Sequence, residues 1–480
     1  MGLVGILLGL GLLMWLAYRG WSVLMVAPAA AILAAAISGE PLLAHWTQTF
    51  MGGAGRFVTQ WFPMFLLGGL FGKLMDDSGS ITSIARFLTE RLGTRRTMLS
   101  VVLASAVVTY GGVSVFVAFF VLVPMAREMF QAANLPRRLM PAAIGLGAFT
   151  FTMSAMPGTP SVNNAIPMPY FGTTTFAAPG LGIIASIIIM VLGMWWLRRA
   201  EAAARKVGEG YHDGLATSPV NETIRVQASA AGDFDPAEFQ HGQHSASVPP
   251  FTLAVLPLGV VIGMNFLMSL VILPRLDFSF LTEKMWGGTT IGAVAGVWSV
   301  VIALAAATLT VILLNYKRLP ALRESLDAGA ISSVLPILTI ASLVGFGAVV
   351  AALPAFADVR DALLSVGGGP LVSLTIAVNV LAGLTGTASG GMAIVLNILG
   401  DTYVRLAAEH GIDPALMHRV TTIGAGTLDA LPHNGTVLLL FQISGLTHGE
   451  SYLDMVMTVI VTCIIALGAV LVLGSIFGSF

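Results

Sequence analysis

The chain has 480 residues, of which 23 are Lys or Arg and 24 are Asp or Glu, so that 10% are charged whereas 56% are hydrophobic. Soluble domains average about 25% charged residues, so the composition excludes a soluble enzyme. The apolar residues come in runs of about 20, the length that crosses a bilayer core of about 30 Å. The sequence therefore predicts an all-α polytopic membrane protein.

Charge and cysteine content argue against further classes of protein. The formal net charge is −1 and no long basic or acidic tract occurs, so nucleic acid is not an expected partner. Cys463 is the single cysteine and lies in a hydrophobic run, which excludes a disulfide framework and a cysteine-based metal site. We expect neither a cofactor nor a metal.

The uninterrupted apolar runs predict the ordinary membrane spans. Residues 1–18 lack the basic segment of a cleavable signal peptide and lead into another apolar run, so we interpret them as the first span. Lys73, Asp76 and Asp77 end the third run, where we expect the inner membrane interface. Runs of spanning length occupy residues 3–18, 22–38, 57–75, 176–197, 251–272, 288–314, 331–353 and 455–478.

Four further apolar stretches are interrupted near their middle by Gly, Pro, Ser, Thr or Asn. Residues 98–126 and 371–400 break at glycine-rich segments, whereas 139–170 and 418–445 break at segments that contain proline. The two kinds of break occur in the same order in both halves, with an offset of roughly 275 residues, as in transporters built from internal repeats. We therefore expect a duplication.

The positions of Lys and Arg test a topology, since short cytoplasmic loops carry the excess of positive charge. If 98–126 and 371–400 are re-entrant hairpins and the other ten stretches cross, most of the 23 Lys and Arg residues fall on one side. This predicts two inverted repeats of five spans each, with one re-entrant hairpin and one broken helix per repeat and both termini outside. The first repeat is 1–198 and the second is 251–480, joined by a polar cytoplasmic linker, 199–250.

The four breaks indicate a ligand site within the membrane. A broken helix frees backbone N–H and C=O groups, which are tolerated at membrane depth only where they line a cavity or are buried in protein. Half-helix N-termini can hold a carboxylate without a buried Lys or Arg, and none of the breaks contains either residue. We therefore expect a small organic anion as substrate. The candidate binding residues are Gly111, Gly112, Ser114, Gly158, Thr159, Ser161, Asn163, Asn164, Thr387, Ser389, Gly390 and Asn434.

Two simpler roles remain open for these residues. Gly and Ser at the hairpin tips let helices pack closely, and Asn163, Asn164 and Asn434 can satisfy carbonyl groups that a proline kink frees. Because the breaks recur in one order, we favour a ligand site.

Asp429 and His433 are the ionisable pair deep in a predicted break. An ionisable residue inside a membrane is a functional candidate by default, and histidine titrates closest to physiological pH. We expect one of the two to couple proton entry to substrate binding. The alternative is that they hydrogen-bond to each other and only fix the shape of the break.

The segment 151–174 resembles the gluconate:proton symporter (GntP) family, through Phe151, Pro157, Gly158, Thr159, Pro160, Asn163, Asn164 and Gly172 among others. The order of apolar runs agrees along nearly the whole chain. The resemblance implies the ion-transporter superfamily fold of inverted repeats with paired hairpins, usually as a homodimer. Gluconate members carry a histidine in the first break, whereas this chain has its histidine at 433, which favours a monocarboxylate smaller than gluconate.

The expected function is secondary active transport in the inner (plasma) membrane. The protein would be a proton symporter for a small organic anion, such as gluconate or 3-hydroxybutyrate, with elevator-type alternating access. Sodium coupling is an alternative, since unwound carbonyls with Thr387, Ser389 and Asn434 could bind sodium. An intramembrane serine hydrolase would need Ser389 within about 2.6–3.2 Å of His433 and leaves the duplication unexplained, so we expect no enzyme.

Overall fold

The computed structural model describes residues 2–480 except 20, 94–95, 212–243, 246, 366 and 433. The described residues form helices and no strand. Seven helical segments are long and apolar enough to cross a membrane, and several shorter apolar helices accompany them. These observations confirm the predicted all-α polytopic membrane protein.

The first half contains two apolar helices, a long helix, a hairpin and a broken helix. In chain order the elements are α1 (Gly2–Tyr18), α2 (Val23–Ile37), α3 (Leu42–Ala44), the π-helix η1 (His45–Phe50), α4 (Met51–Asp77), α5 (Ser80–Leu92), α6 (Thr97–Tyr110), α7 (Val115–Ala132), η3 (Arg137–Leu139), α8 (Met140–Ala148), α9 (Phe151–Ser154), α10 (Val162–Ala165), α11 (Met168–Phe171) and α12 (Pro179–Lys206).

The second half also contains a hairpin and a broken helix. They are α14 (Phe251–Phe266), η5 (Leu267–Ile272), η6 (Leu273–Arg275), η7 (Ser279–Thr282), η8 (Lys284–Trp286), α15 (Ile291–Asn315), η9 (Tyr316–Arg318), α16 (Leu322–Ser332), α17 (Val334–Ala352), α18 (Phe356–Leu364), α19 (Gly369–Thr385), α20 (Ala388–Glu409), α21 (Pro414–Leu428), α22 (Gly435–Ser444), α23 (His448–Met455), η10 (Val456–Val461) and α24 (Thr462–Phe477).

Local chemistry explains where the helices break. Gly112 and Gly386 stand at the hairpin tips with φ of 92° and 68°, a left-handed conformation that glycine adopts without a steric penalty. Pro157 and Pro432 lie between α9 and α10 and between α21 and α22, and proline removes a helical N–H donor. Each half thus has one hairpin, α6–α7 or α19–α20, and one broken helix.

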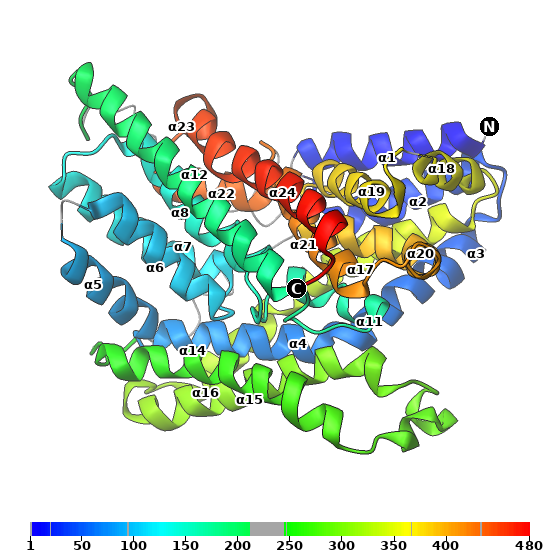
Figure 1. Cartoon of the computed structure of the whole chain (residues 1–480), viewed down its shortest axis with the longest axis horizontal. Helices are drawn as coiled ribbons and strands as arrows, with labels where there is room; N and C mark the ends of the chain where they lie inside the picture. Colours follow the sequence, from blue (N-terminus) through cyan, green and yellow to red (C-terminus); the bar gives the residue numbers. More distant parts are fainter. Residues whose placement is uncertain are drawn as a thin grey trace.

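Helix α4 organises the molecule around the breaks. It crosses the width of the view in Figure 1, with α14, α15 and α16 below it. It packs against α15, α16 and α17, and the approach to α16 is close, since a Cβ atom on Gly69 would lie 2.5 Å from the backbone oxygen of Gly329. Figure 1 places α6, α7, α8 and α12 toward one end and α1, α2, α18, α19 and α20 toward the other.

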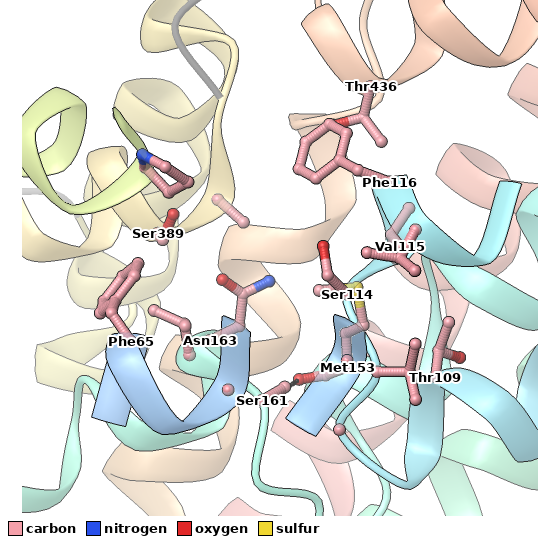
Figure 2. A pocket seen from close by; sticks show the side chains of 18 of the residues that line it. Phe65, Thr109, Ser114, Val115, Phe116, Met153, Ser161, Asn163, Ser389 and Thr436 are labelled. Atoms are coloured by element: carbon pink, nitrogen blue, oxygen red, sulfur yellow. Dashed lines mark hydrogen bonds between the residues drawn. The ribbon is translucent and has the colours of Figure 1, made fainter. Parts of the chain in front are cut away.

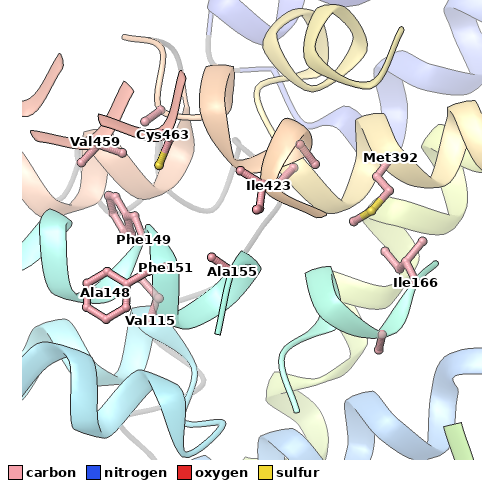
Figure 3. Close-up of a cluster of buried hydrophobic side chains, with 14 of the residues drawn as sticks. Val115, Ala148, Phe149, Phe151, Ala155, Ile166, Met392, Ile423, Val459 and Cys463 are labelled. Atoms are coloured by element: carbon pink, nitrogen blue, oxygen red, sulfur yellow. The ribbon is translucent and has the colours of Figure 1, made fainter. Parts of the chain in front are cut away.

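A buried apolar cluster joins the two halves of the chain. Figure 3 shows Phe149 and Phe151 of the first half near Val459 and Cys463 of the second, with Ile423 of α21 beside them. Helix α24 packs against both α12 and α21. The halves therefore share one core rather than forming separate units.

The structure corrects two expectations about charged residues. The predicted topology treats residues 73–97 as a loop, whereas this stretch is largely helical, because α4 continues to Asp77 and α5 follows. Lys73 is buried in α4, where its Nζ atom lies 2.9 Å from Oδ1 of Asp77. The same topology treats Arg419 as a loop residue on the opposite side of the membrane, whereas it is fully buried in α21. A buried cation needs hydrogen-bond or ion-pair partners nearby. The position of Lys73 or Arg419 along an apolar run of the sequence does not show whether the fold supplies such partners.

Candidate functional site

A cavity of about 240 Å³ lies where all four breaks meet. Residues 112–117 and 387–389 of the hairpin tips line it, together with residues 160–163 of the first broken helix and Asp429, Ala430, Asn434, Thr436 and Val437 of the second. Figure 2 shows Ser114, Asn163 and Ser389, which come from three separate segments, pointing toward this space. Pockets for drug-sized ligands measure about 300–1,000 Å³, so the size indicates a smaller ligand.

Three half-helices begin at the cavity. Helix α7 begins after Ser114, α20 after Thr387 and α22 after Asn434, and these three preceding residues all line the cavity. The N-terminal turn of a helix presents free N–H groups and a partial positive charge. The convergence of three such ends forms an environment that favours an anion.

The first broken helix restarts as a short turn rather than a long helix. Ser161 caps the four-residue α10, accepts a hydrogen bond from the backbone N–H of Asn164 at 3.3 Å, and donates to the backbone oxygen of Met153 at 2.6 Å. A helix this short has little dipole, so Ser161 and Asn163 contribute side-chain polar groups to the cavity.

The charge of the described lining supports an anion site with one acidic group. Among the described residues that line the cavity there is no Lys or Arg, and Asp429 is the one acidic residue. Asp429 follows α21 directly. An ionised carboxylate opposes the binding of an anion, whereas a protonated one does not. The cavity therefore combines anion-attracting helix ends with a group whose protonation would favour anion binding.

In each break a side chain hydrogen-bonds to the backbone oxygen of the proline. The hydroxyl of Tyr110, at the end of α6, donates to the backbone oxygen of Pro157 at 2.7 Å. In the second half, Nε2 of His448 lies 3.0 Å from the backbone oxygen of Pro432. Because carbonyl groups at membrane depth need partners, these contacts fix the shape of both breaks.

The predicted site residues divide into two groups, and one further residue is not described by the structure. Those that line the cavity are Gly112, Ser114, Ser161, Asn163, Thr387, Ser389, Asn434 and Asp429. Those that are not among the lining residues are Gly111, Gly158, Thr159, Asn164 and Gly390. His433 lies outside the described residues.

Asn164 has a role different from that of its neighbour Asn163. Its Nδ2 donates to the backbone oxygens of Thr159 at 3.1 Å and Thr175 at 3.0 Å, and its side chain is fully buried. Asn164 therefore fills the simpler role considered above: it donates hydrogen bonds to backbone carbonyl groups that the break leaves without a helical partner. Gly158 belongs to the same packed region, since its backbone oxygen accepts from Nδ2 of Asn265.

Sequence reasoning missed the wall of the cavity that faces the hairpin tips. Met64, Phe65, Gly68, Gly69 and Gly72 of α4 line it, as do Ser332, Ser333, Pro336 and Ile340 around the junction of α16 and α17. Both stretches look like ordinary spans. The available signals were the glycines at 68, 69 and 72 and the Ser-Ser pair followed by Pro336.

The comparisons with known proteins agree on a transporter. No protein-family model matches the chain. It is 38% identical to the uncharacterized transporter YxjC of Bacillus subtilis over 462 residues, 95% of each chain. It is 27% identical to the high-affinity gluconate transporter of Escherichia coli over 169 residues, 34% of this chain and 37% of that one. The chain belongs to the gluconate permease (GntP) family.

Solved structures support the fold of this GntP-family protein. The YdaH transporter of Alcanivorax borkumensis aligns with a TM-score of 0.57 at 16% identity, over 91% of this chain and 89% of that one. The MtrF efflux pump of Neisseria gonorrhoeae aligns with a TM-score of 0.54 at 14% identity, over 95% and 94%. YxjC and the gluconate transporter are named as transporters, so the GntP-family chain is a multi-pass membrane transporter and not an enzyme.

Proposed function

We propose that the protein is a proton symporter for a small organic anion. The observation that carries the proposal is the convergence of the N-termini of α7, α20 and α22 on one cavity, whose described lining contains no Lys or Arg. A small carboxylate suits such a site, because free N–H groups bind it without a cationic side chain.

Proton coupling follows from the acidic group in the cavity. With Asp429 ionised, the substrate carboxylate meets a like charge across a cavity of about 240 Å³. With Asp429 protonated, that repulsion disappears. Substrate and proton therefore bind together, which is the requirement for symport. His433 remains a second candidate for this role.

The lining favours a short substrate with an apolar body. Beside the polar break residues, the cavity is lined by Met64, Phe65, Phe116, Phe149 and Met153. A sugar acid such as gluconate would place several hydroxyl groups against these side chains, and unpaired polar groups are costly to bury. A short hydroxycarboxylate such as 3-hydroxybutyrate has fewer groups to satisfy.

The transport movement in this proposal is of the elevator type. The hairpins and broken helices carry the substrate, and α4 with α16 and α17 belongs to the scaffold. The chain would form two inverted repeats, 1–198 and 251–480, with a cytoplasmic linker between them. The protein would lie in the inner membrane, since the relatives are bacterial transporters. In this proposal it forms a homodimer.

Sodium coupling is the second candidate. Thr387 and Ser389 lie in one tip, with their hydroxyl oxygens 3.2 Å apart, and the backbone oxygen of Gly386 accepts from Asn434 beside them. Hydroxyl and carbonyl oxygens of unwound segments are suitable sodium ligands.

Uptake into proteoliposomes tests both candidates. Purified protein is reconstituted with an acidic exterior, and uptake of labelled 3-hydroxybutyrate, butyrate and gluconate is followed with sodium or with choline. The proposal predicts concentrative uptake of at least one acid that needs the pH gradient and is unchanged in choline. Uptake that needs sodium supports the second candidate. No uptake of any of these acids under either gradient would contradict both.

A further inference from the structure

Arg419 is a buried cation in the middle of the molecule. It lies in α21 with none of its surface exposed, and no ion pair of the described residues includes it. A buried charge without a counterion needs a dense set of hydrogen-bond acceptors.

The acceptors of Arg419 all belong to the first half of the chain. Nε donates to the backbone oxygen of Ala177 at 3.1 Å, and Nη1 donates to the backbone oxygen of Ser154 at 2.9 Å. Nη1 also lies 3.3 Å from Oδ1 of Asn164. Ser154 precedes α10, Asn164 lies within it and Ala177 follows it, so the acceptors span the first break. A guanidinium group suits this task because its five N–H donors form a rigid plane.

His418 reinforces the same contact. Its Nε2 atom lies 3.2 Å from Oδ1 of Asn164, and its Nδ1 atom lies 2.7 Å from the hydroxyl of Thr173. Because Nδ2 of Asn164 donates to two carbonyls, Oδ1 is the atom that faces α21. Nε2 of His418 therefore carries a proton, and Nδ1 is free to accept from Thr173. Asn164 thus receives two donors from adjacent residues of the second half.

Asn164 connects this network to the cavity. It lies in α10 next to Asn163, and its backbone N–H donates to Ser161, the capping residue. Asn163 and Ser161 line the cavity, whereas Asn164 points into the protein. The hydrogen bonds from Arg419 and His418 to Asn164 therefore determine which side chains of α10 face the ligand.

We propose that Arg419 is a positioning residue for the first-half wall of the cavity. Through Asn164 it fixes the rotation of α10, so that Ser161 and Asn163 face the ligand. A residue of the second repeat thereby shapes the binding surface of the first. The inference concerns the cavity to which the proposed function assigns the substrate, but it depends on neither the substrate nor the coupling ion.

Cysteine labelling tests this inference without transport. In a Cys463→Ala background, Asn163→Cys reports on the first-half wall and Thr436→Cys reports on the second-half wall of the same cavity. The rate of modification by N-ethylmaleimide is measured for each reporter with Arg419 intact, with Arg419→Gln, with Arg419→Lys and with Asn164→Ser. Arg405→Gln serves as the matched control, because Arg405 is a largely exposed arginine of the same half.

The proposal predicts a local effect. Arg419→Gln and Asn164→Ser should each lower the labelling rate of the Asn163→Cys reporter by about tenfold, because α10 is then free to turn residue 163 away from the cavity. The rate at the Thr436→Cys reporter should change less than twofold, and Arg405→Gln should change neither. Arg419→Lys, which keeps the charge but has fewer donors, should be intermediate. If Arg419→Gln does not fold, Asn164→Ser and Arg419→Lys decide the question. Equal decreases at both reporters, or no decrease at the Asn163→Cys reporter, would overturn the inference.

Discussion

Asn434 joins the second break to the tip of the second hairpin. Its Nδ2 atom donates to the backbone oxygen of Gly386 at 2.7 Å, and its Oδ1 atom accepts from the backbone N–H of Val437 at 2.9 Å. One side chain thus caps α22 and holds Gly386, the residue that follows α19. The N-termini of α20 and α22 are thereby fixed next to each other at the cavity.

Replacing Asn434 by Asp separates these two roles. A carboxylate still caps α22, but it cannot donate to Gly386 and it brings a negative charge to the anion site. We expect Asn434→Asp to lower the apparent affinity for the transported acid at least about tenfold, or 1.4 kcal/mol, and to lower thermal stability as well, because the buried oxygen of Gly386 loses its donor. Concentration-dependent uptake measures the effect. Wild-type affinity in this variant would show that Asn434 does not face the substrate.

Asp429→Asn imitates the protonated state of the coupling residue. The amide keeps the size of the side chain but cannot release a proton. We expect accumulation driven by a pH gradient to be lost, whereas exchange of labelled for unlabelled acid at equal pH continues. Both are measured in the same proteoliposomes, and His433→Ala is examined in parallel. If accumulation persists in both variants, neither residue couples transport to protons.

The pair Lys73 and Asp77 predicts a stability effect away from the cavity. Both side chains are buried, at 1% and 0% exposure, and breaking such a pair by removing one partner costs about 3–5 kcal/mol. We expect Lys73→Met to lower the midpoint of thermal unfolding clearly, and Lys73→Met with Asp77→Leu to recover most of the loss. As a control, Arg323→Met removes a pair that is 95% and 69% exposed and should change little. Equal midpoints for Lys73→Met and the control would refute this account of the pair.

Local sequence signals predict the breaks because their chemistry is local. Gly112 and Gly386 occupy conformations that few other residues tolerate, and Ser114 and Thr387 directly precede new helices. These features depend on a few neighbouring residues. The positions of the hairpin tips and breaks can therefore be predicted from the amino-acid sequence.

Which neighbour faces the ligand depends on tertiary contacts. Asn163 and Asn164 are adjacent and chemically identical, yet only Asn163 lines the cavity, because Asn164 is held by Arg419 and His418, more than 250 residues away in the chain. The wall on α4 was missed for a similar reason. Gly68 and Gly72 lie in a normal apolar run, and only the packing of the hairpins beside it makes them part of a site.

The central claim is that the cavity between the breaks carries the transported anion. Gly68 lines it, and a Cβ atom there would meet nothing within 4 Å, so leucine would extend into the cavity without disturbing α4. Gly55 is the matched control, because it lies on the same helix, also has open space and does not line the cavity.

Uptake driven by a pH gradient in vesicles that contain Gly68→Leu or Gly55→Leu is the most direct test. Both variants should keep wild-type thermal stability. We predict that Gly55→Leu takes up the acid at the wild-type rate, whereas Gly68→Leu loses at least about nine-tenths of uptake, as expected when a small site is filled. Wild-type uptake by a folded Gly68→Leu protein would contradict the assignment of this cavity as the transport site.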